Sequence, residues 1–143
     1  MLKKLAAAVL TSVGLFCVNM APTFARPSDS FTIHKTVYPS KCSLAFNGSR
    51  YYCDYVVVGA FNDGSGNLKL CSQQYCLILE ITASQLANVA AERDFNVYQI
   101  SWQQGNKILY ESNSSMRCGF SRSDGIGCIG TSENGTKIAI YTE

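Results

Sequence analysis

Residues 41–54 read KCSLAFNGSRYYCD, and this stretch decides the fold that we expect for the chain. Its centre, Asn47-Gly48, is the dipeptide best suited to the positive backbone dihedrals of a two-residue hairpin turn. With these two residues as the loop, Cys42 falls directly opposite Cys53, within reach of a disulfide bond. The stretch therefore predicts an antiparallel β-hairpin that a disulfide closes at its base.

Six of the seven cysteines lie beyond residue 41, and this even number predicts three disulfides if the chain folds in an oxidising compartment. A loop at Gln73-Gln74 sets the second pair opposite each other, and a loop from Ser121 to Gly125 does the same for the third. All three predicted pairs are therefore local: Cys42 with Cys53, Cys71 with Cys76, and Cys118 with Cys128.

The N-terminus has the three parts of a secretory signal peptide. Lys3 and Lys4 precede an apolar run from Leu5 to Val18, and small residues lead to a cleavage site near Ala25. The run has about 14 residues and a spanning helix needs roughly 20, so we expect no membrane span in the mature chain. We predict a signal peptide over 1–25, a single disulfide-stapled β-rich domain over 26–143, and a secreted or periplasmic location.

The net charge of +2 comes from the predicted signal peptide. The chain has 12 basic and 10 acidic residues, and loss of Lys3 and Lys4 leaves 10 of each. A neutral domain without a cluster of Lys and Arg lacks the electrostatic footprint of a protein that binds nucleic acid or a membrane surface. Neither partner is expected.

Alternating apolar residues bounded by Gly, Asn and Asp predict about nine short strands. They are expected near 41–46, 50–61, 67–72, 75–81, 98–103, 107–111, 115–121, 126–131 and 136–142. Residues 26–38 are expected to form a loose arm or an edge segment. One helix is predicted near 82–94, where Thr82 and Gln85 match a capping box. The fold class is therefore α+β, mostly antiparallel β, sandwich- or barrel-like, with one helix.

The strands near 98–111 also suggest a register. A three-residue loop over 104–106 would pair Trp102 with Ile108 and Ile100 with Tyr110, so that apolar side chains face each other.

Motifs for catalysis or ligation are weak. A structural metal site would need closely paired cysteines with histidines, whereas the single histidine is His34. Residues 125–130 spell G-x-G-x-x-G but open no predicted helix, so they lack a phosphate cradle. We expect no metal and no cofactor, and we single out no catalytic residue.

The surplus of aromatic residues favours a non-enzymatic, exported binding or interaction module, with a protein or a glycan at the cell envelope or outside as its partner. One alternative is an inhibitor of a secreted hydrolase that presents the loop between Cys118 and Cys128. Another is a small cell-envelope hydrolase that uses an acid pair such as Asp54 with Glu80 or Glu111. The candidate binding residues lie on the expected strands and hairpin tips: Tyr52, Tyr55, Trp102, Gln104, Asn106, Arg122 and Asp124.

Overall fold

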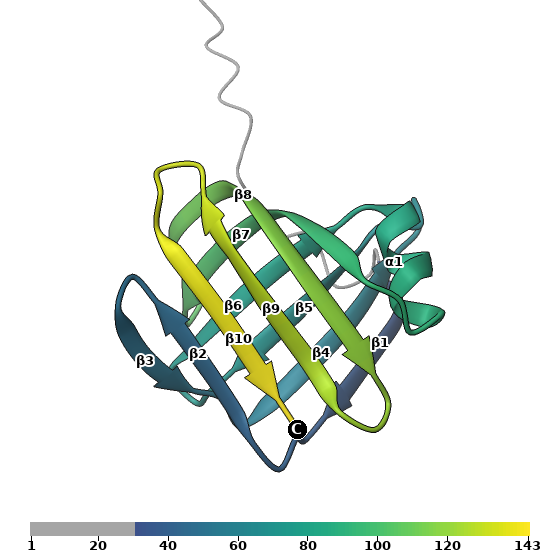
Figure 1. Ribbon diagram of the computed structural model, residues 1–143, viewed down its shortest axis with the longest axis horizontal. Helices are drawn as coiled ribbons and strands as arrows, with labels where there is room; N and C mark the ends of the chain where they lie inside the picture. The colour runs from purple at the N-terminus through teal and green to yellow at the C-terminus, as the bar shows by residue number, and fades with distance from the viewer. Residues whose placement is uncertain (1–30) are drawn as a thin grey trace, which may run out of the picture.

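The computed structural model describes residues 31–143, and the predicted signal peptide lies outside these residues (Figure 1). The described chain forms ten antiparallel strands and one short helix. In chain order these are β1 (Phe31–Val37), β2 (Cys42–Phe46), β3 (Ser49–Tyr52), β4 (Tyr55–Phe61), β5 (Gly66–Cys71), β6 (Tyr75–Ile81), α1 (Ala83–Ala90), β7 (Phe95–Gln104), β8 (Lys107–Ser121), β9 (Gly125–Ser132) and β10 (Lys137–Thr142). No helix in this part of the chain is long and apolar enough to cross a membrane.

All ten strands belong to one sheet, in the order β1-β4-β5-β6-β7-β8-β9-β10-β2-β3. The shape of the sheet follows from one long hairpin that has two halves. β2 and β3 form the half nearer the turn, and β1 and β4 form the other half. The half nearer the turn pairs with β10, and the other half pairs with β5. The bent hairpin thus joins both ends of the sheet, which curls into a half-barrel. Figure 1 shows β8, β9, β10 and β2 crossing in front of β4, β5 and β6.

The turn of this hairpin is the predicted one. Asn47 and Gly48 have φ values of 50° and 80°, and Leu44 pairs with Tyr51 as the two-residue loop requires. The disulfide between Cys42 and Cys53 follows from that register.

The other two predicted disulfides are also present. They join residues that are direct partners, Cys71 with Cys76 across β5 and β6, and Cys118 with Cys128 across β8 and β9. The turn between β5 and β6 needs help because glutamines are poor turn formers. Ser72 stabilises it, since its hydroxyl oxygen accepts hydrogen bonds from the backbone N–H groups of Gln74 at 3.1 Å and Tyr75 at 3.2 Å.

The core lies inside the curled sheet. Leu44, Leu70, Leu77, Leu79 and Ile100 are fully buried there, and they come from β2, β5, β6 and β7. Two of the disulfides, Cys42–Cys53 and Cys118–Cys128, pack into this core. Cys71 and Cys76 are sequence neighbours of the inward-facing Leu70 and Leu77, so the third disulfide lies on the opposite face of the sheet.

The number of strands differs from the expected count of nine for three reasons. The expected arm contributes the edge strand β1, and the expected strand over 50–61 is broken at Cys53-Asp54 into β3 and β4. In the other direction, the segments expected near 107–111 and 115–121 are one continuous strand, β8.

The helix lies within the predicted range, but the predicted capping box does not form. Thr82 is the N-cap and makes no side-chain capping hydrogen bond. The Gln85 side chain instead accepts a hydrogen bond of 2.7 Å from the backbone N–H of Asn96, at the start of β7. The Gln85 side chain, which the capping box would use, therefore makes a tertiary contact with β7 instead.

The register predicted for β7 and β8 is wrong. The loop has two residues, Gly105 and Asn106, and Gln104 pairs with Lys107. A bulge between Trp102 and Gln103 then shifts the pairing, so that Trp102 faces Tyr110. The bulge keeps aromatic side chains facing each other, which the shorter loop alone would not.

Candidate functional site

A cluster of aromatic side chains lies at the β2–β3 side of the core. Trp102 is its centre, with ring centroids 4.8 Å from Tyr75 and Tyr51 and 5.4 Å from Phe46. Tyr110 completes this aromatic cluster through an edge contact with Phe46. The Tyr75 hydroxyl also donates to the Tyr52 carbonyl and accepts from the Tyr52 N–H. The cluster therefore packs together and satisfies backbone groups of the edge strand β3.

A partly open cavity of about 730 Å³ lies between β1 and the β8–β9 hairpin, with the exposed Val37 and Tyr38 in its lining. Its wall includes side chains of the core itself, since Val56, Leu68 and Phe95 line it and are at most 3% exposed. Val89 of α1 and Phe120 of β8 line it too and pack against the same core. The hydrophobic interior of the half-barrel is thus continuous with the wall of this cavity.

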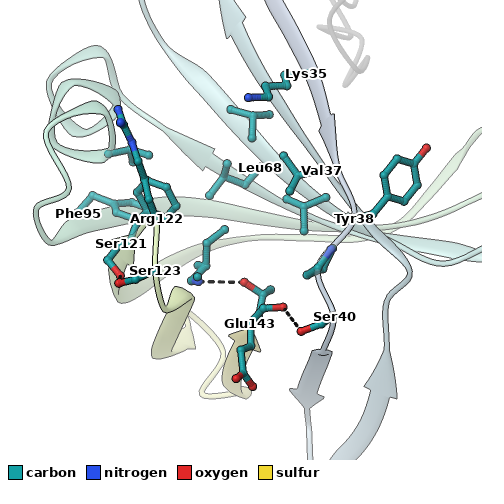
Figure 2. Close-up of a pocket in the computed structure, with 18 of the residues that line it drawn as sticks. Lys35, Val37, Tyr38, Ser40, Leu68, Phe95, Ser121, Arg122, Ser123 and Glu143 are labelled. Carbon is teal, nitrogen blue, oxygen red and sulfur yellow. Dashed lines mark hydrogen bonds between the residues drawn. The ribbon is translucent and has the colours of Figure 1, made fainter.

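Polar groups of the cavity come from its two sides, as Figure 2 shows. Lys35 projects from β1, whereas Ser121, Arg122 and Ser123 belong to the end of β8 and the loop that follows. The backbone N–H of Arg122 donates a hydrogen bond of 2.6 Å to the Glu92 carboxylate, which ties this loop to the turn that follows α1. Most of the lining is apolar, with the charged groups toward the edges.

Glu143 is the one acid among the described residues that line the cavity. Its carboxylate accepts hydrogen bonds from Lys41 Nζ at 2.5 Å and from the Tyr141 hydroxyl at 3.1 Å. These bonds, the one from Lys41 first, lower the pKa of Glu143, and the same contact raises the pKa of Lys41. The negative charge of Glu143 is therefore balanced locally.

The Glu143 main chain also closes this corner of the fold. Its carbonyl accepts from the Ser40 hydroxyl at 2.9 Å (Figure 2). It also accepts from the Lys41 N–H at 3.1 Å. The link between β1 and β2 is thereby held beside the end of β10.

The candidate residues singled out from the sequence do not form one site. Trp102 belongs to the aromatic cluster, and Tyr52 is 64% exposed on β3. Tyr55 begins β4 with its ring centroid 6.2 Å from that of Tyr38. The remaining four lie at two separate hairpin tips: Gln104 and Asn106 between β7 and β8, and Arg122 and Asp124 between β8 and β9.

Arg122 is the one of these candidates that lines the cavity. Asp124, two residues further along the chain, accepts a hydrogen bond of 2.9 Å from the Ser121 hydroxyl and stabilises the turn. The sequence reasoning missed Lys35 and the apolar wall, because residues 26–38 carry no clear periodicity. The useful indication was the valine run at 56–58, whose residues 56 and 58 both line the cavity.

Metal binding and glycoside cleavage each need a particular set of side chains. No three His, Cys, Asp or Glu side chains gather there as a metal ion would require. Nor does the described part of the cavity wall offer the pair of carboxylates that glycoside cleavage needs.

No family model, curated protein or solved structure matches the chain. Function must therefore be inferred from the cavity itself.

Proposed function

We propose that the protein is an exported binding module that holds a small ligand with an apolar body in the cavity between β1 and the β8–β9 hairpin. The observation that carries this proposal is that core side chains such as Leu68 and Phe95 line a cavity of about 730 Å³. Binding sites for small molecules are concave, mostly apolar and roughly 300 to 1,000 Å³ in volume.

The physical basis of binding is burial of apolar surface. A ligand that enters would remove from water its own apolar area and that of the part-exposed wall side chains, such as Val37 and Val58. Each buried methylene stabilises the complex by about 0.8 kcal/mol. The sheet around the cavity is held by three disulfides, and a rigid frame loses little entropy when a ligand binds.

Export is supported separately. The first 25 residues have the pattern of a cleaved leader, and disulfides form and persist in oxidising compartments. The same setting fits the partner expected from the sequence, a protein or a glycan outside the cell. The cavity favours a smaller and more apolar ligand than either of these.

The test is calorimetric titration of the disulfide-bonded protein with octanol, decanol and dodecanol. We expect saturable binding of one molecule per chain, with affinity rising about fourfold for each added methylene. Absence of binding, or an affinity that does not depend on chain length, would overturn the proposal.

Two variants test whether the ligand binds in this cavity. Val58→Phe fills the cavity from β4, and Ala90→Trp puts a large side chain at its wall from the last residue of α1. Both should weaken decanol binding. Ala87→Trp is the matched control, since Ala87 is exposed on the same helix and does not line the cavity. If neither Val58→Phe nor Ala90→Trp weakens binding in variants that keep the native circular dichroism, the ligand lies elsewhere.

A further inference from the structure

We infer that this cavity selects amphiphiles with a compact anionic head group, such as a carboxylate or a sulfate ester, which Lys35 and Arg122 bind at its edges. The inference rests on the proposed function and names the class of ligand that the site takes.

The two cations stand on opposite walls of the same cavity. Lys35 comes from β1 and Arg122 from the loop between β8 and β9, and Figure 2 shows them on either side of the apolar wall. A ligand whose apolar body lies against Leu68 and Phe95 would have its polar end near one or both of these side chains.

Both cations are available to a ligand. Within residues 31–143, Lys41 and Arg117 form ion pairs with Glu143 and Asp94, whereas no ion pair or hydrogen bond involves the side-chain nitrogens of Lys35 or Arg122. A guanidinium that binds no side chain among residues 31–143 and lies beside an apolar wall suits a planar carboxylate, which it binds through two parallel hydrogen bonds.

The acids near Arg122 make hydrogen bonds with groups other than its guanidinium. The Glu143 carboxylate is engaged by Lys41 and Tyr141. The Glu92 carboxylate accepts the backbone N–H of Arg122, and Asp124 accepts from Ser121. None of these carboxylates binds the Arg122 guanidinium, so its N–H donors can bind an anionic head group of the ligand.

The experiment compares three ligands with the same ten-carbon chain, decanol, decanoate and decyl sulfate, near neutral pH and at low salt. We expect decanoate and decyl sulfate to bind about tenfold more tightly than decanol, because each exposed charge pair contributes up to about fivefold. Added salt should reduce this advantage, since exposed charges are screened. The two anions distinguish a preference for carboxylate from a preference for any compact anion.

The variants Lys35→Gln and Arg122→Gln should each weaken decanoate binding by up to about fivefold and leave decanol binding unchanged. Arg50→Gln and Lys107→Gln are matched controls, because these exposed cations lie on β3 and at the start of β8, away from the cavity. They should bind both ligands as the unmodified protein does.

The outcomes separate the two proposals. If decanol binds and decanoate binds no more tightly, or if Lys35→Gln and Arg122→Gln match the controls, the selection for anions is wrong and the cavity remains a binding site. If none of the three ligands binds, the proposed function fails as well.

Discussion

Gly125 shows how a single residue holds the cavity wall together. It begins β9 with a φ of +80°, and a Cβ atom there would lie 2.2 Å from the carbonyl oxygen of Thr142. Gly135 has a similar φ of +85°, but a Cβ atom added there would have no neighbouring atom within 4 Å. The two glycines therefore separate the cost of a left-handed backbone from the cost of a clash.

We predict that Gly135→Ala lowers the free energy of unfolding by roughly 1–2 kcal/mol, the cost of a side chain in the left-handed region. Gly125→Ala should cost more, because β10 must also move away. Urea unfolding of both variants measures the difference. Equal losses would show that the close approach of Gly125 and Thr142 does not constrain this corner.

The ion pair between Lys41 and Glu143 predicts how the stability of the fold depends on pH. Because contact with Lys41 lowers the folded-state pKa of Glu143, the pair stabilises the fold above the pKa of the carboxyl in the unfolded chain. That stability is lost as the pH falls through the folded-state value. On the basic side, the raised pKa of Lys41 means that the stability is lost as the pH rises through its folded-state value.

Lys41→Gln should therefore raise the pKa of Glu143 toward its ordinary value, which a pH titration followed by nuclear magnetic resonance would report. The Tyr141 hydroxyl remains as a hydrogen-bond donor, so the return should be partial. Lys137→Gln at the far end of β10 serves as the control. A Glu143 pKa that is the same in both variants would contradict the ion pair.

The three disulfides differ as structural elements. Those at Cys42–Cys53 and Cys118–Cys128 close longer loops and face the core, whereas Cys71–Cys76 closes a short loop on the other face. In the chain-entropy description, the stability that a disulfide gives rises with the length of the loop it closes.

Replacing both cysteines of a pair with alanine should therefore lower the free energy of unfolding by about 2 kcal/mol for Cys71–Cys76 and about 3 kcal/mol for each of the others. Chemical denaturation of the three double variants gives the ranking. A larger loss for Cys71–Cys76 than for the other two would refute it.

The hairpins were predictable from the sequence where local chemistry determines them. Asn47-Gly48 needs positive φ values, and that need alone sets the register that joins Cys42 to Cys53. The β7–β8 register was not predictable, because the bulge at Trp102 depends on contacts with Phe46 and Tyr75 on other strands. The capping box at Thr82 failed for a similar reason, since Gln85 binds Asn96 instead.

The cavity belongs to the whole molecule, and no local pattern could reveal it. Its walls come from β1, β4, β5, α1 and the β8–β9 hairpin, which meet only because the bent hairpin joins the two ends of the sheet. The composition predicts a β-rich protein with a core, but the place where that core meets open space depends on the curvature of the sheet. Lys35 and Arg122 are far apart in the sequence and share a site for this reason.

The most direct test of the account is the position of a bound ligand. Methyl resonances should be followed while decanol is added to the disulfide-bonded protein. The account predicts saturable shifts for Val56, Val58 and Leu68, which line the cavity, and none for Leu44 and Ile138, which are buried in the core away from it. Shifts that do not saturate, or that appear instead at the exposed Leu109 and Ile129 on the outside of the sheet, would contradict it.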